Sequence, residues 1–196
     1  MRLKILKNGH TFLQKLQFRV IKKMMGEVPG PIAVMSYRRQ FFGKHFAPWL
    51  NQAMRKMKHW TIGEVELMAA FVSKNNECQY CYGDHVAVAK NVYEEKLVIA
   101  IMEDIDTAPI EAKLKVTLQF LQKLTVNPSA LTKNDIAPLR EVGLSNDAIQ
   151  EAVQVCGAFS VVNRLADAFD FELSSQPAKV GRFLFKNGYG LASVKG

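Results

Sequence analysis

The sequence predicts an all-α helical bundle, on three observations. Apolar residues recur at i, i+3, i+4 and i+7 over most of the chain, which is the spacing of one helix face. Alternating runs of β-branched residues between tight turns, which would indicate strands, are scarce. Helix-start signals precede several of the periodic segments, such as the capping box formed by Thr61 and Glu64.

Six helices are expected after a Pro/Gly hinge at residues 26–31. Their approximate ranges are 32–57, 62–73, 78–101, 109–125, 133–141 and 146–169. Thr132 and Asp135 form a looser capping box, and Gly143 followed by Ser145 marks a helix end and the next helix start. Beyond the last helix we expect an irregular, Gly-containing tail.

The chain is long enough for one substantial core, at 196 residues with 48% hydrophobic residues. We expect residues 29–196 to form a single helical domain and residues 1–28 to be a basic amphipathic N-terminal extension. Three cysteines are too few for a disulfide scaffold, and their odd number leaves a thiol unpaired. A reducing, cytoplasmic location is therefore expected.

The formal net charge of +8 is concentrated in the N-terminal third. Residues 1–63 hold 13 lysines and arginines against one acid, Glu27, whereas residues 64–196 hold 13 against 17 acids. Basic residues interrupt the first 26 positions so often that the apolar region of a secretory signal cannot form. No stretch approaches the roughly 18 apolar residues of a membrane span either.

Residues 12–25 have the pattern of a basic amphipathic helix. Such a helix could lie on an anionic membrane surface, address an organelle or touch nucleic acid. We favour packing of its apolar stripe on this protein or on a copy of it, with the lysines in water. No nucleic-acid partner is expected, because the chain has no aromatic-interleaved basic patch and no recognised nucleic-acid fold signature.

In the helix expected over 62–73, Glu66 lies beside Val65 and Ala69 of the apolar stripe. A carboxylate there is predicted to face inward, where desolvation raises its pKa and makes it a candidate acid or base. The alternative is a structural glutamate that pairs with a neighbouring basic residue. Glu64 is explained by its place in the capping box.

The stretch "NNECQYCYGDH" places Cys78, Cys81 and His85 at i, i+3 and i+7. At about 100° per residue, all three project from one helix face. Cys78 is expected in the first turn after Asn75 and Asn76, where unpaired backbone N–H groups and the helix dipole lower a thiol pKa. His85 could take a proton from Cys81 directly or through one water.

From these residues alone, the motif is a redox dithiol, a metal site or a coincidence of small polar residues. A zinc site needs four ligands, and without a second C-x-x-C only Glu66 could supply the fourth. A lone His85 is more often an ordinary core or surface histidine. Cys156 lies on the apolar face of the last predicted helix and is interpreted as a small buried hydrophobe.

The stretch "ELMAAFVSKNNECQYCYGDH" resembles the core signature of the alkylhydroperoxidase D (AhpD) and carboxymuconolactone decarboxylase-like superfamily. That signature is a glutamate, eleven residues, Cys-x-x-Cys, three residues and a histidine. The stretch "LREVGLSNDAIQEAVQVCGAFSVVNRLADAFDFEL" resembles the peroxidase-related branch, and the likeness covers about residues 30–175. Glu77 stands where a glycine is common, and Tyr80, usual in that branch, stands where AhpD has a histidine.

The resemblance implies an AhpD-like helical bundle that assembles as a trimer or hexamer and uses no cofactor or metal. It implies that Cys81 attacks a hydroperoxide and that Cys78 resolves the resulting sulfenic acid as a disulfide. A dihydrolipoamide- or thioredoxin-like dithiol would then reduce the pair. Glu66 and His85 would relay protons. The helix-dipole argument instead favours Cys78 as the more acidic thiol, and for the order of attack we follow the family.

The expected function is therefore that of an antioxidant enzyme, a thiol-dependent alkylhydroperoxide reductase. Within the same fold, the alternative is a ring-lactone decarboxylase or isomerase, although those decarboxylases typically lack the dithiol. The alternative from another class is a non-enzymatic redox sensor or scaffold, docked through the basic leader on an acidic partner or a membrane.

Overall fold

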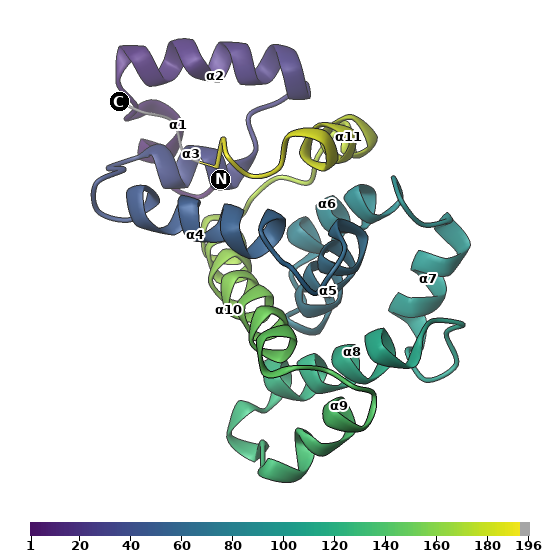
Figure 1. Ribbon diagram of the computed structural model, residues 1–196. Coiled ribbons are helices and arrows are strands. Elements are labelled where there is room, and N and C mark those ends of the chain that lie inside the picture. Colours follow the sequence, from purple (N-terminus) through teal and green to yellow (C-terminus); the bar gives the residue numbers. More distant parts are fainter. Residues whose placement is uncertain (193–196) are drawn as a thin grey trace.

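The computed structural model describes residues 1–192 and confirms the all-α prediction (Figure 1). The α-helices are α1 (Ile5–Asn8), α2 (Phe12–Met25), α3 (Gly30–Ser36), α4 (Gly43–Arg55), α5 (Ile62–Asn75), α6 (Gln79–Ala89), α7 (Glu95–Glu103), α8 (Ala112–Val126), α9 (Ala137–Glu141), α10 (Asn146–Phe169) and α11 (Pro177–Asn187). Two short 3-10 turns, Pro128–Ala130 and Lys133–Asp135, precede α9. These 192 residues contain no strand.

The helix α5 lies at the centre of the bundle and packs against α6, α8 and α10 (Figure 1). It is apolar on nearly all sides, and every residue from Val65 to Ser73 is buried. A helix of this kind belongs in a core. On the far side of α6 lies α11, which packs against it. The acidic Glu66 is therefore enclosed in the middle of the protein.

Several predicted helices are confirmed with small shifts at their ends. Residues 12–25 form α2, 62–73 lie within α5, 109–125 correspond to α8, and 146–169 form α10. The capping box of Thr61 and Glu64 is present, and the Ser145 hydroxyl caps α10. The box of Thr132 and Asp135 also forms, but it caps a 3-10 turn rather than an α-helix.

The prediction of one helix over 32–57 is wrong, because the chain reverses between α3 and α4. Arg38, within that reversal, has φ of 46°. A Cβ atom at Gly43 would lie 1.8 Å from the Met35 carbonyl oxygen. The two backbone segments therefore touch at a point where only glycine fits.

The prediction of one helix over 78–101 is also wrong, since that segment is divided into α6 and α7. At the break, the Asn91 side chain donates to the carbonyl oxygens of Ala87 and Val88, each at 3.0 Å. It satisfies carbonyls that the end of a helix leaves free. The predicted helix over 133–141 is shorter than expected, because only its second half is α-helical.

The tail that was predicted to be irregular contains α11. Proline at position 177 suits the first turn of a helix, and Gly188, with φ of 66°, ends it. The chain then brings Tyr189 back into the core, where it is 8% exposed. The last four residues of the predicted tail lie outside the described part of the chain.

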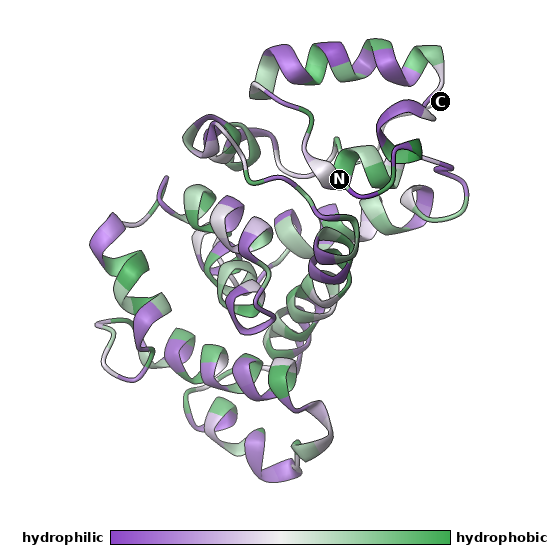
Figure 2. Cartoon of the chain, turned by 180° about the vertical axis from the view of Figure 1, so that it is seen from behind, coloured by the Kyte–Doolittle hydropathy of each residue, from purple (hydrophilic) through white to green (hydrophobic). Residues whose placement is uncertain are grey.

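The N-terminal helices α1 and α2 lie at one edge of the bundle, where apolar and polar residues alternate along α2 (Figure 2). Ile21 and Met25 of α2 pack in a small cluster with Ile32 of α3 and Val180 of α11. The separation of an extension at residues 1–28 from the main domain stays a prediction.

Candidate active site

Glu66 is the centre of a buried polar cluster. Its side chain has no exposed surface. Arg55, at the end of α4, forms an ion pair with Oε1 at 2.7 Å, and His85 Nδ1 of α6 lies 2.6 Å from Oε2. The Tyr189 hydroxyl is 3.1 Å from both carboxylate oxygens. Three other segments of the chain therefore converge on this one carboxylate of α5.

These partners set the charge state of Glu66. Burial alone would raise its pKa, but the adjacent His85 and then Arg55 outweigh burial, and the net pKa is lowered. The sequence-based expectation of a raised pKa is therefore wrong. Its inward orientation is confirmed, and Glu66 is an ionised carboxylate that accepts hydrogen bonds at neutral pH.

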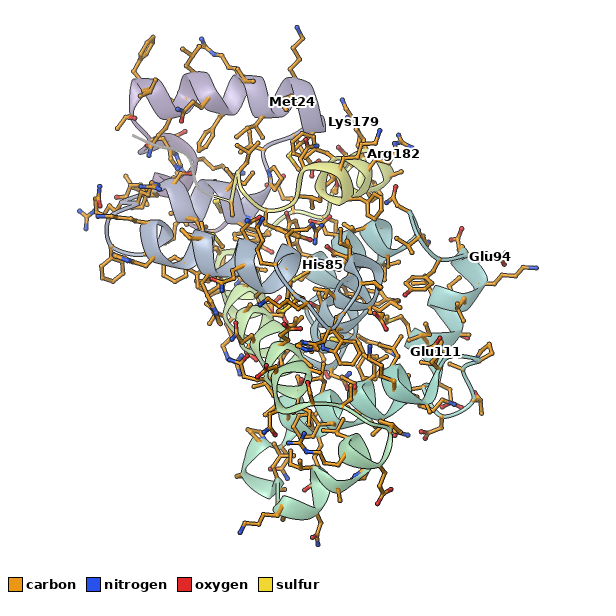
Figure 3. The ribbon with its side chains drawn as sticks, viewed as in Figure 1. Met24, His85, Glu94, Glu111, Lys179 and Arg182 are labelled. Atoms are coloured by element: carbon orange, nitrogen blue, oxygen red, sulfur yellow. The ribbon has the colours of Figure 1, made fainter. Side chains whose placement is uncertain are left out.

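The contact with Glu66 orients the His85 ring. A carboxylate can only accept, so the Nδ1–H of His85 donates to Glu66 and leaves Nε2 free to accept a proton. The ring is held edge-on to Phe159, with centroids 4.4 Å apart, and stacks on Tyr189 at 5.8 Å. His85 is therefore fixed in one tautomer with its basic nitrogen directed away from Glu66. Figure 3 shows it in the interior of the bundle.

The two cysteines of the motif lie at the start of α6. Cys78 is the N-cap residue itself and is fully buried, and Cys81, one turn on, is 2% exposed. Neither of the preceding asparagines caps α6: Asn75 donates to the Phe71 carbonyl oxygen of α5, and Asn76 donates to the Asn163 side chain of α10.

Glu77, directly before the motif, has φ of 60°. This value lies in the left-handed region that glycine adopts most easily. It gives a physical reason why glycine is common at this position in the family that the motif resembles.

The two thiols differ in acidity. The pKa of Cys78 is lowered, mainly because the Cys81 thiol is placed to donate a hydrogen bond to the Cys78 sulfur. The same contact, followed by burial, raises the pKa of Cys81. Because the two neighbouring thiols share this contact, Cys78 is the more acidic thiol of the pair and Cys81 the less acidic one.

A cavity of about 60 Å³ lies against this cluster. Its apolar lining includes Met25, Ile32, Leu50, Phe159, Val162, Leu184 and Leu191. The polar side chains that reach it are those of Tyr80, Cys81, Asp84, His85 and Tyr189. Cys81 and His85 therefore face a common space, whereas Cys78 lies behind it and is not among the lining residues.

Three residues of the site escaped the sequence analysis: Arg55, Asp84 and Tyr189. Burial raises the pKa of Asp84 to about 6, although His85 nearby lowers it. Asp84 directly precedes His85, so its place in the motif was a usable signal. Arg55 and Tyr189 carry no such signal, because they meet Glu66 only in the folded chain.

The structure also bears on the prediction for Cys156 and on the alternative of a metal site. Cys156 is buried in α10, with Thr125 Oγ1 3.4 Å from its sulfur, and burial raises its pKa. The interpretation of Cys156 as a small buried side chain is confirmed. Within residues 1–192, no three histidine, cysteine or acidic side chains gather in a way that could hold a metal ion. Among these residues, no helix is long and apolar enough to cross a membrane.

Solved structures with this fold include two peroxidase-related proteins. One, from Silicibacter sp. TM1040, matches with a TM-score of 0.77 and 22% identity, over 88% of this chain and 91% of its own. The other, from Ralstonia eutropha JMP134 and described as an alkylhydroperoxidase AhpD core, has a TM-score of 0.73 and 21% identity over 89% and 92%. The debrominase Bmp8 matches with a TM-score of 0.70 and 19% identity over 87% and 91%.

No model of a protein family matches the sequence, and no curated protein matches it. The structural likeness nevertheless extends over nearly the whole of each chain. The protein therefore has the AhpD-like all-helical fold found in peroxidase-related proteins, as the cysteine motif predicted.

Proposed function

We propose that the protein is a thiol-dependent hydroperoxide reductase. The observation that carries the proposal is that Cys81 and His85 face one apolar cavity, with Cys78 within hydrogen-bonding reach behind Cys81. A thiol peroxidase needs a nucleophilic sulfur, a nearby acid–base group and a resolving thiol. The two cysteines, His85 and Glu66 supply these groups without a cofactor.

The first step is attack of the Cys81 sulfur on the terminal oxygen of a hydroperoxide, ROOH. The S–O bond forms as the O–O bond breaks, and the leaving alkoxide takes a proton to become ROH. His85, with Nε2 free and Nδ1 held by Glu66, carries the thiol proton to the alkoxide. Cys81 is left as a sulfenic acid.

In the second step, Cys78 attacks the sulfenic sulfur, and hydroxide leaves with a proton as water. The product is a Cys78–Cys81 disulfide, so one hydroperoxide is reduced to alcohol and water while two thiols are oxidised. A dihydrolipoamide- or thioredoxin-like dithiol returns both cysteines to the thiol form by disulfide exchange. The lowered pKa of Cys78 suits the resolving role, because the thiolate is the form that attacks.

A second candidate reaction follows from the apolar lining of the cavity. A cysteine-to-alanine variant of the debrominase Bmp8, 18% identical to this chain, has been solved with 2,3,4-tribromopyrrole. Applied to this chain, the dithiol would reduce a small haloaromatic, ArBr, to ArH and bromide, and would again end as the Cys78–Cys81 disulfide. The two substrates differ, but the thiol chemistry required is the same.

We further propose a cytoplasmic homo-oligomer, a trimer or a hexamer, as the working form. Light scattering at micromolar concentration tests this, and a monomeric mass contradicts it.

Substrate consumption tests the proposed reaction. Reduced protein with excess dihydrolipoamide is supplied with hydrogen peroxide, cumene hydroperoxide or 2,3,4-tribromopyrrole in parallel, and loss of each substrate is measured. We expect turnover of the organic hydroperoxide that Cys81→Ser abolishes and that the matched control Cys156→Ser leaves unchanged. Turnover of the pyrrole alone selects the second candidate.

Other outcomes overturn both reactions. Loss of carbon dioxide from a carboxylated ring lactone, independent of thiol reductant, indicates the decarboxylase. Stoichiometric oxidation of Cys78 and Cys81 without any turnover indicates a redox sensor.

A further inference from the structure

The helix α2 has two unlike faces. On its inner face, Ile21 and Met25 are buried against Ile32 of α3 and Val180 of α11. Gln14, also buried, donates to the carbonyl oxygen of Ser36 at 2.8 Å. These contacts fix the rotation of α2 on the edge of the bundle and so determine which side chains point away from it.

The outer face of α2 is apolar and exposed to solvent. Its side chains are Phe12 (80% exposed), Leu13 (48%), Leu16 (45%), Val20 (54%) and Met24 (44%). Four of them are spaced by four residues, so they advance around the helix in steps of about 40° and cover a sector of about 120°. The sequence favoured packing of the whole stripe on this protein or a copy, but within one chain only the inner residues pack.

Basic side chains border this outer stripe. In α2, Lys15, Arg19 and Lys22 lie along one side of the stripe, and Lys23 projects between Phe12 and Leu16. The helix contains no acidic residue. Figure 3 shows Lys179 and Arg182 of α11 at the same edge of the molecule as Met24. An apolar sector bordered by cations is the pattern of helices that lie in the plane of a membrane surface.

Charge favours a bilayer over a second copy as the occupant of this face. Pairing α2 with the α2 of another copy would bring four cations against four without a compensating acid in either helix, and like charges repel. The headgroups of anionic lipids attract each of these cations instead. We propose that the outer face of α2 docks on an anionic lipid bilayer, with Phe12, Leu16 and Val20 inserted below the lipid phosphates.

Vesicle flotation with the full-length chain tests this proposal. The protein is mixed with vesicles of pure phosphatidylcholine or of phosphatidylcholine with phosphatidylglycerol, and the bound fraction is measured. We expect binding to the anionic vesicles only, weakened by added salt because the lipid charge is screened. In Lys15→Gln with Arg19→Gln, affinity should fall about fivefold for each cation removed. The double variant Leu16→Glu with Val20→Glu, which places two carboxylates in the apolar stripe, should not bind.

Matched variants outside α2 serve as controls. Val92→Glu with Val126→Glu changes two valines of similar exposure, and Lys96→Gln with Lys133→Gln removes two exposed lysines. Both should bind like the unaltered protein, and circular dichroism should give the same helix content for all variants. The proposal is overturned by absence of binding, by equal binding to neutral vesicles, or by equal losses in the controls. A fall in light-scattering mass for Leu16→Glu with Val20→Glu, without vesicle binding by the parent, would assign the stripe to a copy interface.

Discussion

Glu66→Gln removes a charge from the most buried part of the protein and should be strongly destabilising. Glu66 is fully buried, and Arg55 opposite it has a side chain only 10% exposed. The substitution keeps the shape but leaves the Arg55 guanidinium without its counter-ion. Breaking a buried ion pair in this way costs about 3–5 kcal/mol. For a chain of this size, that corresponds to a fall in Tm of roughly 6–20 °C, measured by circular dichroism.

The matched control is Glu64→Gln, the same change two residues earlier in α5. Glu64 accepts from the Thr61 backbone and hydroxyl in the capping box, and glutamine at this position can make the same bonds. We expect a change within about 0.5 kcal/mol. Equal Tm shifts for Glu64→Gln and Glu66→Gln would refute the reasoning. Adding Arg55→Met to Glu66→Gln should recover part of the stability, since no unpaired cation remains.

The loss of stability in Glu66→Gln should also depend on pH in a defined direction. Because the folded state lowers the pKa of Glu66 below its ordinary value of 4.5, ionised Glu66 stabilises the protein above that value. This stability is lost as the pH falls through the lowered pKa. The Tm difference between the parent and Glu66→Gln should therefore be largest at neutral pH and should shrink in acid.

Three other changes have definite expected results. Tyr189→Phe removes the hydroxyl contact with Glu66 but keeps the ring, and it should cost about 1.5–3 kcal/mol in chemical denaturation; no change would contradict the contact. Asp84→Asn should speed alkylation of Cys81 above pH 6 but not below pH 5, because ionised Asp84 opposes a thiolate beside it and has a pKa of about 6; a pH-independent effect would contradict this. Removal of residues 1–28, which takes away α1 and α2, should leave the remaining helices folded and speed alkylation of Cys81, since Met25 lines the cavity; unfolding would show that the extension belongs to the core.

Local signals in the sequence were sufficient for the helices whose ends they mark. The capping box of Thr61 and Glu64 and the Ser145 cap place the starts of α5 and α10 correctly. The break before Gly43 could not be predicted, because it depends on contact with the Met35 backbone. The helix α11 was missed because its short amphipathic pattern follows a stretch rich in polar residues, contains Gly181 and is followed by two more glycines, Gly188 and Gly190.

The spacing of Glu66, Cys78, Cys81 and His85 was readable because three of the four share one helix. The structure brings Glu66 against His85 and Cys81 into the same cavity as His85. The sign of the Glu66 pKa shift was not predictable, since it depends on how closely His85 and then Arg55 approach from two other helices. A buried carboxylate with an unknown partner leaves burial as the only effect that can be estimated.

The location of the sulfenic acid is the most direct test of the proposed division of labour between the two thiols. Reduced Cys78→Ser protein is treated with cumene hydroperoxide and a sulfenic-acid-trapping reagent, and the labelled peptide is identified by mass spectrometry. We predict the label on Cys81, which faces the cavity, and none in a parallel sample of Cys81→Ser. A label on Cys78 in the Cys81→Ser protein, with Cys81 unlabelled in the other variant, would contradict the proposal and would assign the attack to the more acidic thiol.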